Sequence, residues 1–219
     1  MMAMILENAM LCLMVSYHSC DHHYHHYFII IVSGNAESLA PIISEMYHLD
    51  WIHSITAGID HLICPEITQL QGVTITNAKG IYSSSLAEYV MAACSYFNKD
   101  IPRLIQNKND KKWDRFTVGE LKGKCLGIIG YGDIGSATAR LANAYGMKVL
   151  ALRKRPELST DDHWVDRVYG IDGLATIMAE SDFIVVALAL TKDTIHFIKE
   201  KHFKRYNFIV DNNISLILI

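Results

Sequence analysis

A glycine run in the middle of the chain has the spacing of a phosphate-binding turn. An apolar stretch over residues 126–129 leads into Gly-Tyr-Gly-Asp-Ile-Gly at 130–135, and a helical pattern follows. Here Gly130 permits a tight turn after a strand, Gly132 lets the backbone approach a pyrophosphate, and Gly135 lets the helix pack closely on the strand. The phosphates would then lie at the positive end of that helix. The run therefore predicts a dinucleotide site.

The rest of the chain alternates strand and helix patterns, which predicts an α/β protein. A right-handed doubly wound sheet is the natural assembly around the glycine run. The expected strands are residues 28–32, 51–55, 73–76, 126–129, 148–152, 183–187 and 208–210. The expected helices are residues 38–46, 83–97, 134–145, 171–180 and 199–203.

Composition excludes some classes of function. The 219 residues carry a net charge of −3, which gives no electrostatic case for nucleic acid. No apolar run reaches the length of a membrane span, and the first 15 residues lack the basic start of a signal peptide. The five cysteines show no zinc or C-x-x-C spacing, so we expect reduced thiols in a cytoplasmic protein.

A histidine-rich tract near the start invites a metal-site interpretation. His18, His22, His23, His25 and His26 stand close to Cys20 and Asp21, and such tracts can bind zinc, copper or nickel. Consecutive histidines do not preset one coordination geometry, however, and no second ligand cluster follows. We therefore expect no metal site and interpret residues 1–27 as an irregular, solvated leader.

A polar connection divides the chain into two expected domains. Residues 98–122 are rich in charge, and the large aromatic Trp113 stands alone among them. An isolated tryptophan on a polar connection is typical of a contact with another domain or subunit. We expect a first α/β domain over residues 28–97, the connection as a dimerisation arm, and a nucleotide domain over residues 123–219.

Basic residues follow the second strand of the nucleotide domain. Arg153, Lys154 and Arg155 stand where an NAD-specific fold usually carries an acidic residue for the ribose 2′-hydroxyl. Positive charge there suits a 2′-phosphate, so we favour NADP(H) over NAD(H). Ordinary surface charge is the alternative interpretation of these three residues.

Five stretches, taken in order, carry a family resemblance. They are residues 51–62 (WIHSITAGIDHL), Ala87-Glu88, the segment around Trp113, the glycine run and residues 181–186 (SDFIVV). Together they resemble the D-isomer-specific 2-hydroxyacid dehydrogenase family, and most closely its glyoxylate/hydroxypyruvate reductase-like branch, over residues 28–210. The resemblance implies a flavodoxin-like substrate domain, a Rossmann nucleotide domain, a homodimer, and reduction of a small 2-oxo acid with NAD(P)H.

The resemblance also implies roles for particular residues. The amides of Ala57 and Gly58 would hold the substrate carboxylate, because turn N–H groups form an anion nest. Further residues would contact the cofactor. The pyrophosphate contacts would be Asp133 and Ile134, and the adenosine side would be lined by Leu188, Ala189, Leu190 and Thr194.

The last residues depart from the family pattern. Ile214 stands where the resemblance places a catalytic arginine, and the family's acidic residue and histidine have no sequence left to occupy. We therefore assign no catalytic residue and interpret the chain as C-terminally truncated, with an incomplete nucleotide domain. Two hypotheses stay open: an NAD(P)-dependent 2-hydroxyacid dehydrogenase with impaired activity, and a non-catalytic nucleotide-binding or dimer-forming remnant.

Overall fold

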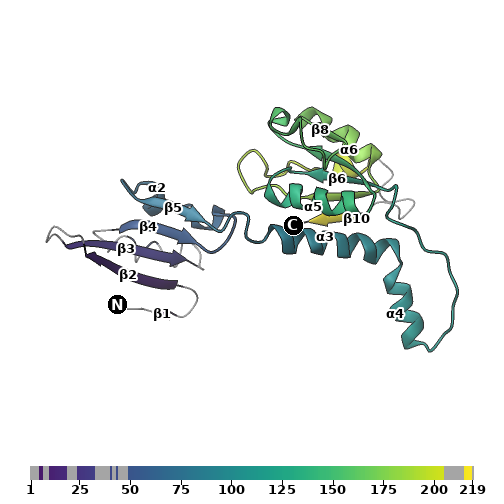
Figure 1. Cartoon of the computed structure of the whole chain (residues 1–219), viewed down its shortest axis with the longest axis horizontal. Coiled ribbons are helices and arrows are strands. Elements are labelled where there is room, and N and C mark those ends of the chain that lie inside the picture. The colour runs from purple at the N-terminus through teal and green to yellow at the C-terminus, as the bar shows by residue number, and fades with distance from the viewer. Residues whose placement is uncertain are drawn as a thin grey trace. The chain divides into compact units, whose positions relative to one another are not determined.

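The computed structural model describes residues 5–6, 10–18, 24–32, 40, 43, 49–204 and 215–218, and Figure 1 shows the whole chain. The described residues form two compact units, one up to Ile81 and one from Tyr82 onward. Each has its own sheet. None of the described helices is both long enough and apolar enough to cross a bilayer.

The first unit contains a mixed five-stranded sheet in the order β1-β2-β3-β4-β5. Its β3, β4 and β5 run parallel, whereas β1 pairs with β2, and β2 with β3, in the antiparallel sense. The parallel pairing expected of a flavodoxin-like sheet is therefore present in β3, β4 and β5, whereas β1 and β2 add antiparallel strands. The bounds are β1 (Ile5–Leu6), β2 (Met10–His18), β3 (Tyr24–Val32), β4 (Leu49–Ser54) and β5 (Thr74–Asn77).

The irregular leader expected over residues 1–27 is wrong for the described part of that segment, which forms β1, β2 and the start of β3. The ladder of β2 and β3 runs from Met10 opposite Val32 to His18 opposite Tyr24. β3 is rich in β-branched and aromatic residues, which favour strands, and β2 is mostly apolar. In β3 this local preference outweighs the polar histidines. His18, His25 and His26 lie in these two strands, and His22 and His23 lie outside the described residues.

A small core supports the loop that leaves β4. Short helices η1 (Asp60–Leu62) and α2 (Pro65–Thr68) connect β4 to β5. Leu62 and Ile67 from these helices pack with Ile52 of β4 and with Ile43. The helix expected over residues 38–46 is described only at Ala40 and Ile43, which are both helical.

The second unit contains a fully parallel sheet in the order β10-β9-β6-β7-β8. Numbered from the glycine-run strand β6 onward, this is the order 3-2-1-4-5 read from β8, which is the Rossmann order. The chain therefore runs from β6 to β7 and β8 on one side of β6, and then crosses to β9 and β10 on the other side. The strands are β6 (Cys125–Ile129), β7 (Lys148–Leu152), β8 (Arg167–Tyr169), β9 (Phe183–Val186) and β10 (Ser215–Leu218).

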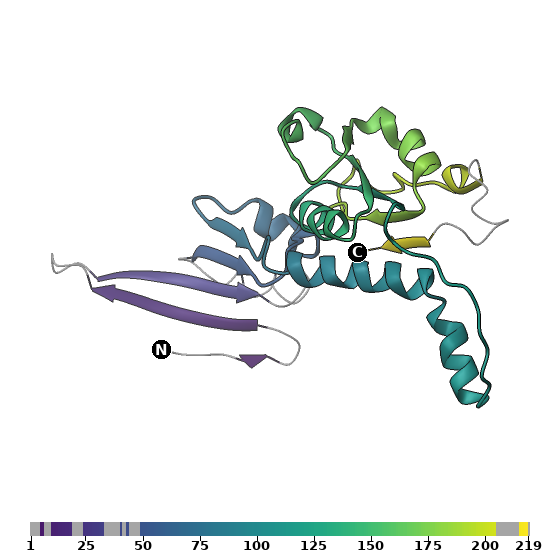
Figure 2. The same ribbon diagram turned by 45° about the vertical axis from the view of Figure 1, so that its right-hand side comes forward.

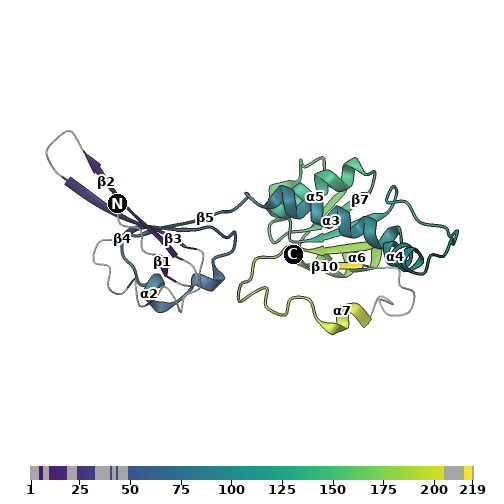
Figure 3. The same cartoon turned by 90° about the horizontal axis from the view of Figure 1, so that it is seen from below.

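Alternation along the strands builds a core on each face of this sheet. Leu126 and Ile128 of β6 pack with α3 (Ser83–Asn98) and α5 (Asp133–Ala144), which lie next to one another in Figure 3. Cys125 and Ile129 face α6 (Leu174–Glu180) instead. Burial on both faces explains the continuous apolar strands. Three short helices lie in the connections of this sheet, η2 (Pro156–Ser159), η3 (Ile171–Gly173) and α7 (Glu200–Lys204).

Helix α3 packs with the second unit, although the sequence suggested that the helix over residues 83–97 closes the first domain. Its buried face carries Val90, Met91 and Cys94, which share a core with α5 and β6. Burial raises the pKa of the Cys94 thiol to about 12. The compact units thus divide before α3, and not in the polar connection.

The polar connection contains a helix that the charge pattern concealed. Helix α4 (Ile101–Asn109) begins at Asp100, whose side chain accepts a hydrogen bond from Arg103 N. Arg103 then ties the helix to the returning chain, because its guanidinium binds the Asp114 carboxylate at 2.7 Å and lies over the Phe116 ring. Figure 2 shows this arm standing out from the sheet.

Other expected elements match with small shifts. The helix predicted over residues 171–180 divides into η3 and α6, and that over residues 199–203 becomes α7. The short strand β8 was not predicted, because three residues, of which one is exposed and two are half-buried, give no clear period. The strand expected over residues 208–210 lies outside the described residues, and β10 pairs with β9.

Candidate functional site

The glycine turn begins where β6 ends. Gly130 has a φ of +106°, a conformation that residues with a side chain rarely adopt. A Cβ at this position would also overlap the carbonyl oxygen of Ala187. The N–H groups of Gly130 and Tyr131 both donate to the carbonyl of Leu152 at 3.1 Å, which fixes the turn to the end of β7.

The other two glycines meet opposite steric conditions. A Cβ at Gly135 would overlap the carbonyl oxygen of Gly130, so α5 can approach the strand only with glycine there. A Cβ at Gly132 would have no protein atom within 4 Å. Gly132 thus leaves open space above its backbone, into which a pyrophosphate can come close.

Helix α5 starts directly at this open position. Gly132 is its N-cap, and no side chain caps the helix there. The first-turn residues Asp133 and Ile134 follow, and Ser136 N donates back to the Gly132 carbonyl at 2.9 Å. A helix start carries partial positive charge and N–H groups that suit an anion. The turn and the helix therefore fit the pyrophosphate of a dinucleotide.

Tyr131, inside the glycine run, has a contact that the sequence did not reveal. Its buried hydroxyl donates to the Asp162 carboxylate at 2.7 Å, and Trp164 N donates to the same carboxylate at 3.0 Å. Burial and the bond to Asp162 both raise the pKa of the Tyr131 hydroxyl. This contact ties the turn to the loop that follows β7.

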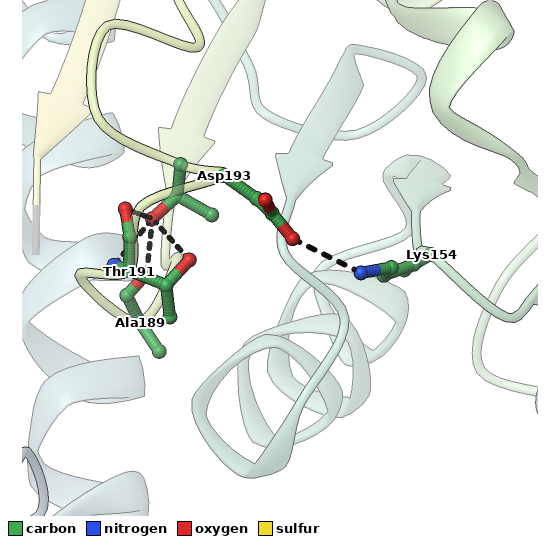
Figure 4. A network of polar contacts seen from close by, with 5 residues as sticks. Lys154, Ala189, Thr191 and Asp193 are labelled. Carbon is green, nitrogen blue, oxygen red and sulfur yellow. Dashed lines mark hydrogen bonds and ion pairs between the residues drawn. The ribbon is translucent and has the colours of Figure 1, made fainter.

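The three basic residues after β7 have different surroundings. Arg153 is half-buried, and its guanidinium donates to the Ser159 hydroxyl. Lys154 reaches across to Asp193, with 3.2 Å between Nζ and Oδ2 (Figure 4). Arg155 is exposed. The cluster is thus divided, with one cation engaged locally, one paired across the sheet edge and one pointing to solvent.

The loop after β9 lies at the same edge of the sheet. Leu188 is half-buried, and its side chain lies 3.1 Å from the place where a Cβ on Gly130 would be. Ala189 and Leu190 are exposed. Thr194 organises the loop, because its hydroxyl donates to the Ala189 carbonyl at 2.6 Å and accepts from Thr191 N at 2.8 Å. These residues flank the switch point between β6 and β9, where ligands bind in doubly wound sheets.

The proposed carboxylate loop belongs to the first unit and follows β4. Thr56 joins its parts, since its hydroxyl donates to the Gly58 carbonyl at 2.7 Å and bonds Ser54 Oγ at 2.7 Å. His61 Nε2 lies 3.4 Å from the same hydroxyl. These contacts hold Ala57 and Gly58 in a compact turn.

Asn77, at the end of β5, and the next residue, Ala78, each set the direction of one amide in this turn. Its Nδ2 donates to the Ala57 carbonyl at 2.6 Å, and Ala78 N donates to the Thr56 carbonyl at 3.1 Å. In a planar trans peptide the C=O and N–H point in opposite directions. The N–H groups of Ala57 and Gly58 therefore both point away from β5, and neither has a protein acceptor among the described residues.

Sequence reasoning missed Asn77, although a signal was present. The residue ends β5, at the carboxyl end where polar residues of parallel sheets meet ligands. Cavities of about 370 Å³ lie elsewhere, one lined by η2 and β8 and another by Asp193, Phe197 and His202. In the part of the chain that the structure describes, no three His, Cys, Asp or Glu side chains gather as metal ligands.

The fold and the turn agree with a family assignment. A sequence model described as "D-isomer specific 2-hydroxyacid dehydrogenase, NAD binding domain" matches residues 91–208, which is more than half of the chain. The chain belongs to this family. Residues 91–208 include the glycine turn and the loop after β9, and the matched NAD binding domain lies within the second unit.

Two curated relatives of the chain carry the names of oxidoreductases. A glyoxylate reductase from Thermofilum pendens is 28% identical over 76% of this chain and 50% of its own length. A hydroxypyruvate reductase from Thermotoga maritima is 32% identical over 74% of this chain and 51% of its own length. The chain thus spans about half the length of these curated relatives.

A solved structure has the same fold. The D-isomer specific 2-hydroxyacid dehydrogenase family protein from Aeromonas salmonicida superimposes with a TM-score of 0.71, over 87% of this chain and 67% of that one, at 22% identity. The chain therefore shares its fold with a solved structure of the family.

Proposed function

We propose that this chain binds NADP(H) in preference to NAD(H) and holds a small 2-oxo acid of the glyoxylate or hydroxypyruvate type for hydride transfer. The observation that carries the proposal is the glycine turn, closed by protein at Gly130 and Gly135 and open at Gly132. Among the three glycines of the run, only the one that must face a pyrophosphate has no protein atom within 4 Å of the place where a Cβ would be. When bound, the nicotinamide would supply the hydride.

The substrate class is inferred from the amide pair and the relatives. The N–H groups of Ala57 and Gly58 are oriented together by Asn77 and Ala78, and two such donors suit one carboxylate. The relatives named above reduce glyoxylate or hydroxypyruvate according to their names. Both compounds are small 2-oxo acids, so the same carboxylate contact serves either.

The cofactor preference rests on the positive charge after β7. Lys154 and Arg155 are exposed at the carboxyl edge of the sheet, where the ribose of a dinucleotide lies in this fold. A 2′-phosphate gains charge-assisted hydrogen bonds from such cations, each of about 1.5–3 kcal/mol. Arg153 supports the site differently, because its guanidinium already binds Ser159.

Slow chemistry is part of the proposal. Hydride addition to a carbonyl builds negative charge on oxygen, which a positioned cation must stabilise. Ile214, at the arginine position of the resemblance, carries no charge. Loss of one such group lowers a rate by ~10²–10³-fold. The uncharged Ile214 also favours the second candidate function, which is a non-catalytic dinucleotide-binding or dimer-forming protein.

Two further features complete the proposed function. We place the protein in the cytoplasm as a homodimer, and the free thiols of Cys64, Cys94 and Cys125 are compatible with a reducing compartment. The dimer would form through the arm that carries Trp113, whose side chain is 88% exposed.

NADPH absorbance followed with glyoxylate and with hydroxypyruvate, from pH 5 to 9, tests the chemistry. We expect dinucleotide binding with turnover well below an ordinary enzyme value of ~10 s⁻¹. Turnover near that value would show that other side chains take the place of the missing cation. Tighter NADPH than NADH binding in a parallel titration would support the cofactor preference, and equal affinities would contradict it.

A further inference from the structure

An ion pair bridges two loops that flank the glycine turn. Lys154 lies just after β7, Asp193 lies in the loop after β9, and Nζ and Oδ2 are 3.2 Å apart (Figure 4). Strand β6 lies between β7 and β9 in the sheet. The pair therefore spans the carboxyl end of β6, where the glycine turn starts.

The backbone holds both members of this pair in place. On one side Arg153 N donates to the Tyr169 carbonyl at 2.9 Å, which extends the β7–β8 ladder to Arg153, the residue directly before Lys154. On the other side the Thr191–Thr194 turn is closed by Thr194 Oγ1, which binds Thr191 N and the Ala189 carbonyl. Asp193 is a member of this closed turn. Its carboxylate is thus presented to Lys154 by a local structure that does not depend on the ion pair.

We infer that Asp193 is a specificity-determining residue, which competes with the 2′-phosphate of a dinucleotide for Lys154. The inference rests on the proposed function, since it concerns the same cofactor site. A 2′-phosphate carries about −1.5 to −2 charges and would bind the Lys154 ammonium as a point charge. While Asp193 holds that ammonium, the phosphate must displace a carboxylate and also approach its negative charge. NADH, which has only a hydroxyl there, meets neither obstacle.

Solvent exposure sets the size of the effect. The side chains of Lys154 and Asp193 are 76% and 79% exposed, so water screens their attraction. An exposed pair of this kind changes an equilibrium by about two- to fivefold. Asp193 is therefore expected to moderate the preference for NADPH without abolishing it.

The test is a double-mutant cycle read out as binding, and it needs no turnover. Dissociation constants for NADPH and NADH are measured by calorimetry for the 219-residue chain, Asp193→Asn, Lys154→Met and the double variant. Asp193→Asn should raise the preference for NADPH over NADH about two- to fivefold. In the Lys154→Met background the same change should leave the preference unaltered. Asp161→Asn, which removes an exposed charge elsewhere after β7, is the matched control and should leave it unaltered too.

Three results would overturn the inference. The first is an unchanged preference in Asp193→Asn, the second is an equal gain in the Lys154→Met background, and the third is an equal gain in Asp161→Asn. The last two would indicate general charge repulsion and not competition for Lys154. If every variant failed to bind both dinucleotides, the proposed function would fall, and this inference with it.

Discussion

The side-chain amide of Asn77 donates to the carbonyl oxygen of Ala57 at 2.6 Å, and this bond turns the next peptide N–H away from β5. Asn77 lies opposite Ser54 in the parallel register of β5 and β4. One residue at a strand end therefore orients the neighbouring loop. In the proposed function this orientation makes the Gly58 amide a carboxylate donor.

Replacement of Asn77 by alanine should weaken carboxylate binding. Loss of one hydrogen bond of ordinary strength costs about 1 kcal/mol, which corresponds to about fivefold in affinity. Calorimetric titration of hydroxypyruvate into the NADPH-saturated protein measures the change. Thr76→Ala is the matched control, because the Thr76 hydroxyl bonds Trp51 and His53 and not the loop. Equal losses in both variants would indicate a general effect on β5 instead.

Trp113 gives a prediction about assembly. Its side chain is 88% exposed on an arm that also exposes Leu104 and Ile105 by 45% and 50%. A central tryptophan contributes more than 1–2 kcal/mol to many interfaces, so Trp113→Ala should raise the dimer dissociation constant about tenfold or more. Sedimentation equilibrium measures this constant, with Lys112→Ala as the neighbouring control. A monomeric parent protein at micromolar concentration would argue against the arm as an interface.

The packing of α3 can be tested through its cysteine. Burial raises the pKa of Cys94 to about 12, so the reactive thiolate amounts to only ~10⁻⁴ of the thiol at pH 8. Cys64 is half-exposed. Site-resolved alkylation at pH 8 should therefore modify Cys64 first and Cys94 only after addition of denaturant. Similar native rates at the two residues would mean that α3 does not pack on α5 as described.

Much of the second unit could be predicted because its signals are local. The apolar period of β6, the glycine spacing and the helix of residues 134–145 lie within about twenty residues, and each is matched in the structure. Three of the five stretches that carried the family resemblance, which are the Trp113 segment, the glycine run and residues 181–186, lie within the residues that the family model matches. Periodicity suffices where one short segment forms one element.

The missed features depend on partners far along the chain. Asn77 acts on a loop twenty residues earlier, and Asp193 meets Lys154 thirty-nine residues away, so no local pattern reveals either contact. Helix α3 was assigned to the first domain because its amphipathic pattern does not say which sheet it covers. Helix α4 was missed because its charged residues resemble a solvated connection, whereas the Asp100 cap and Pro102 in the first turn start a helix.

Gly132→Val tests the central claim that a dinucleotide binds at the glycine turn. Gly132 has φ −103° and ψ −151°, and its Cβ would meet no protein atom within 4 Å, so valine should be accepted without loss of the fold. Its side chain would occupy the space above the turn. Gly135→Ala is the contrasting variant, because its methyl group would overlap the Gly130 carbonyl and lower the melting temperature.

The decisive measurement is a calorimetric titration of NADPH into the parent chain and into Gly132→Val, with melting curves for both. The account predicts binding by the parent, a loss of ~100-fold or more in the variant, equivalent to about 2.7 kcal/mol, and melting temperatures that agree within ~2 °C. Binding of equal strength by Gly132→Val, or no binding by the folded parent, would contradict it.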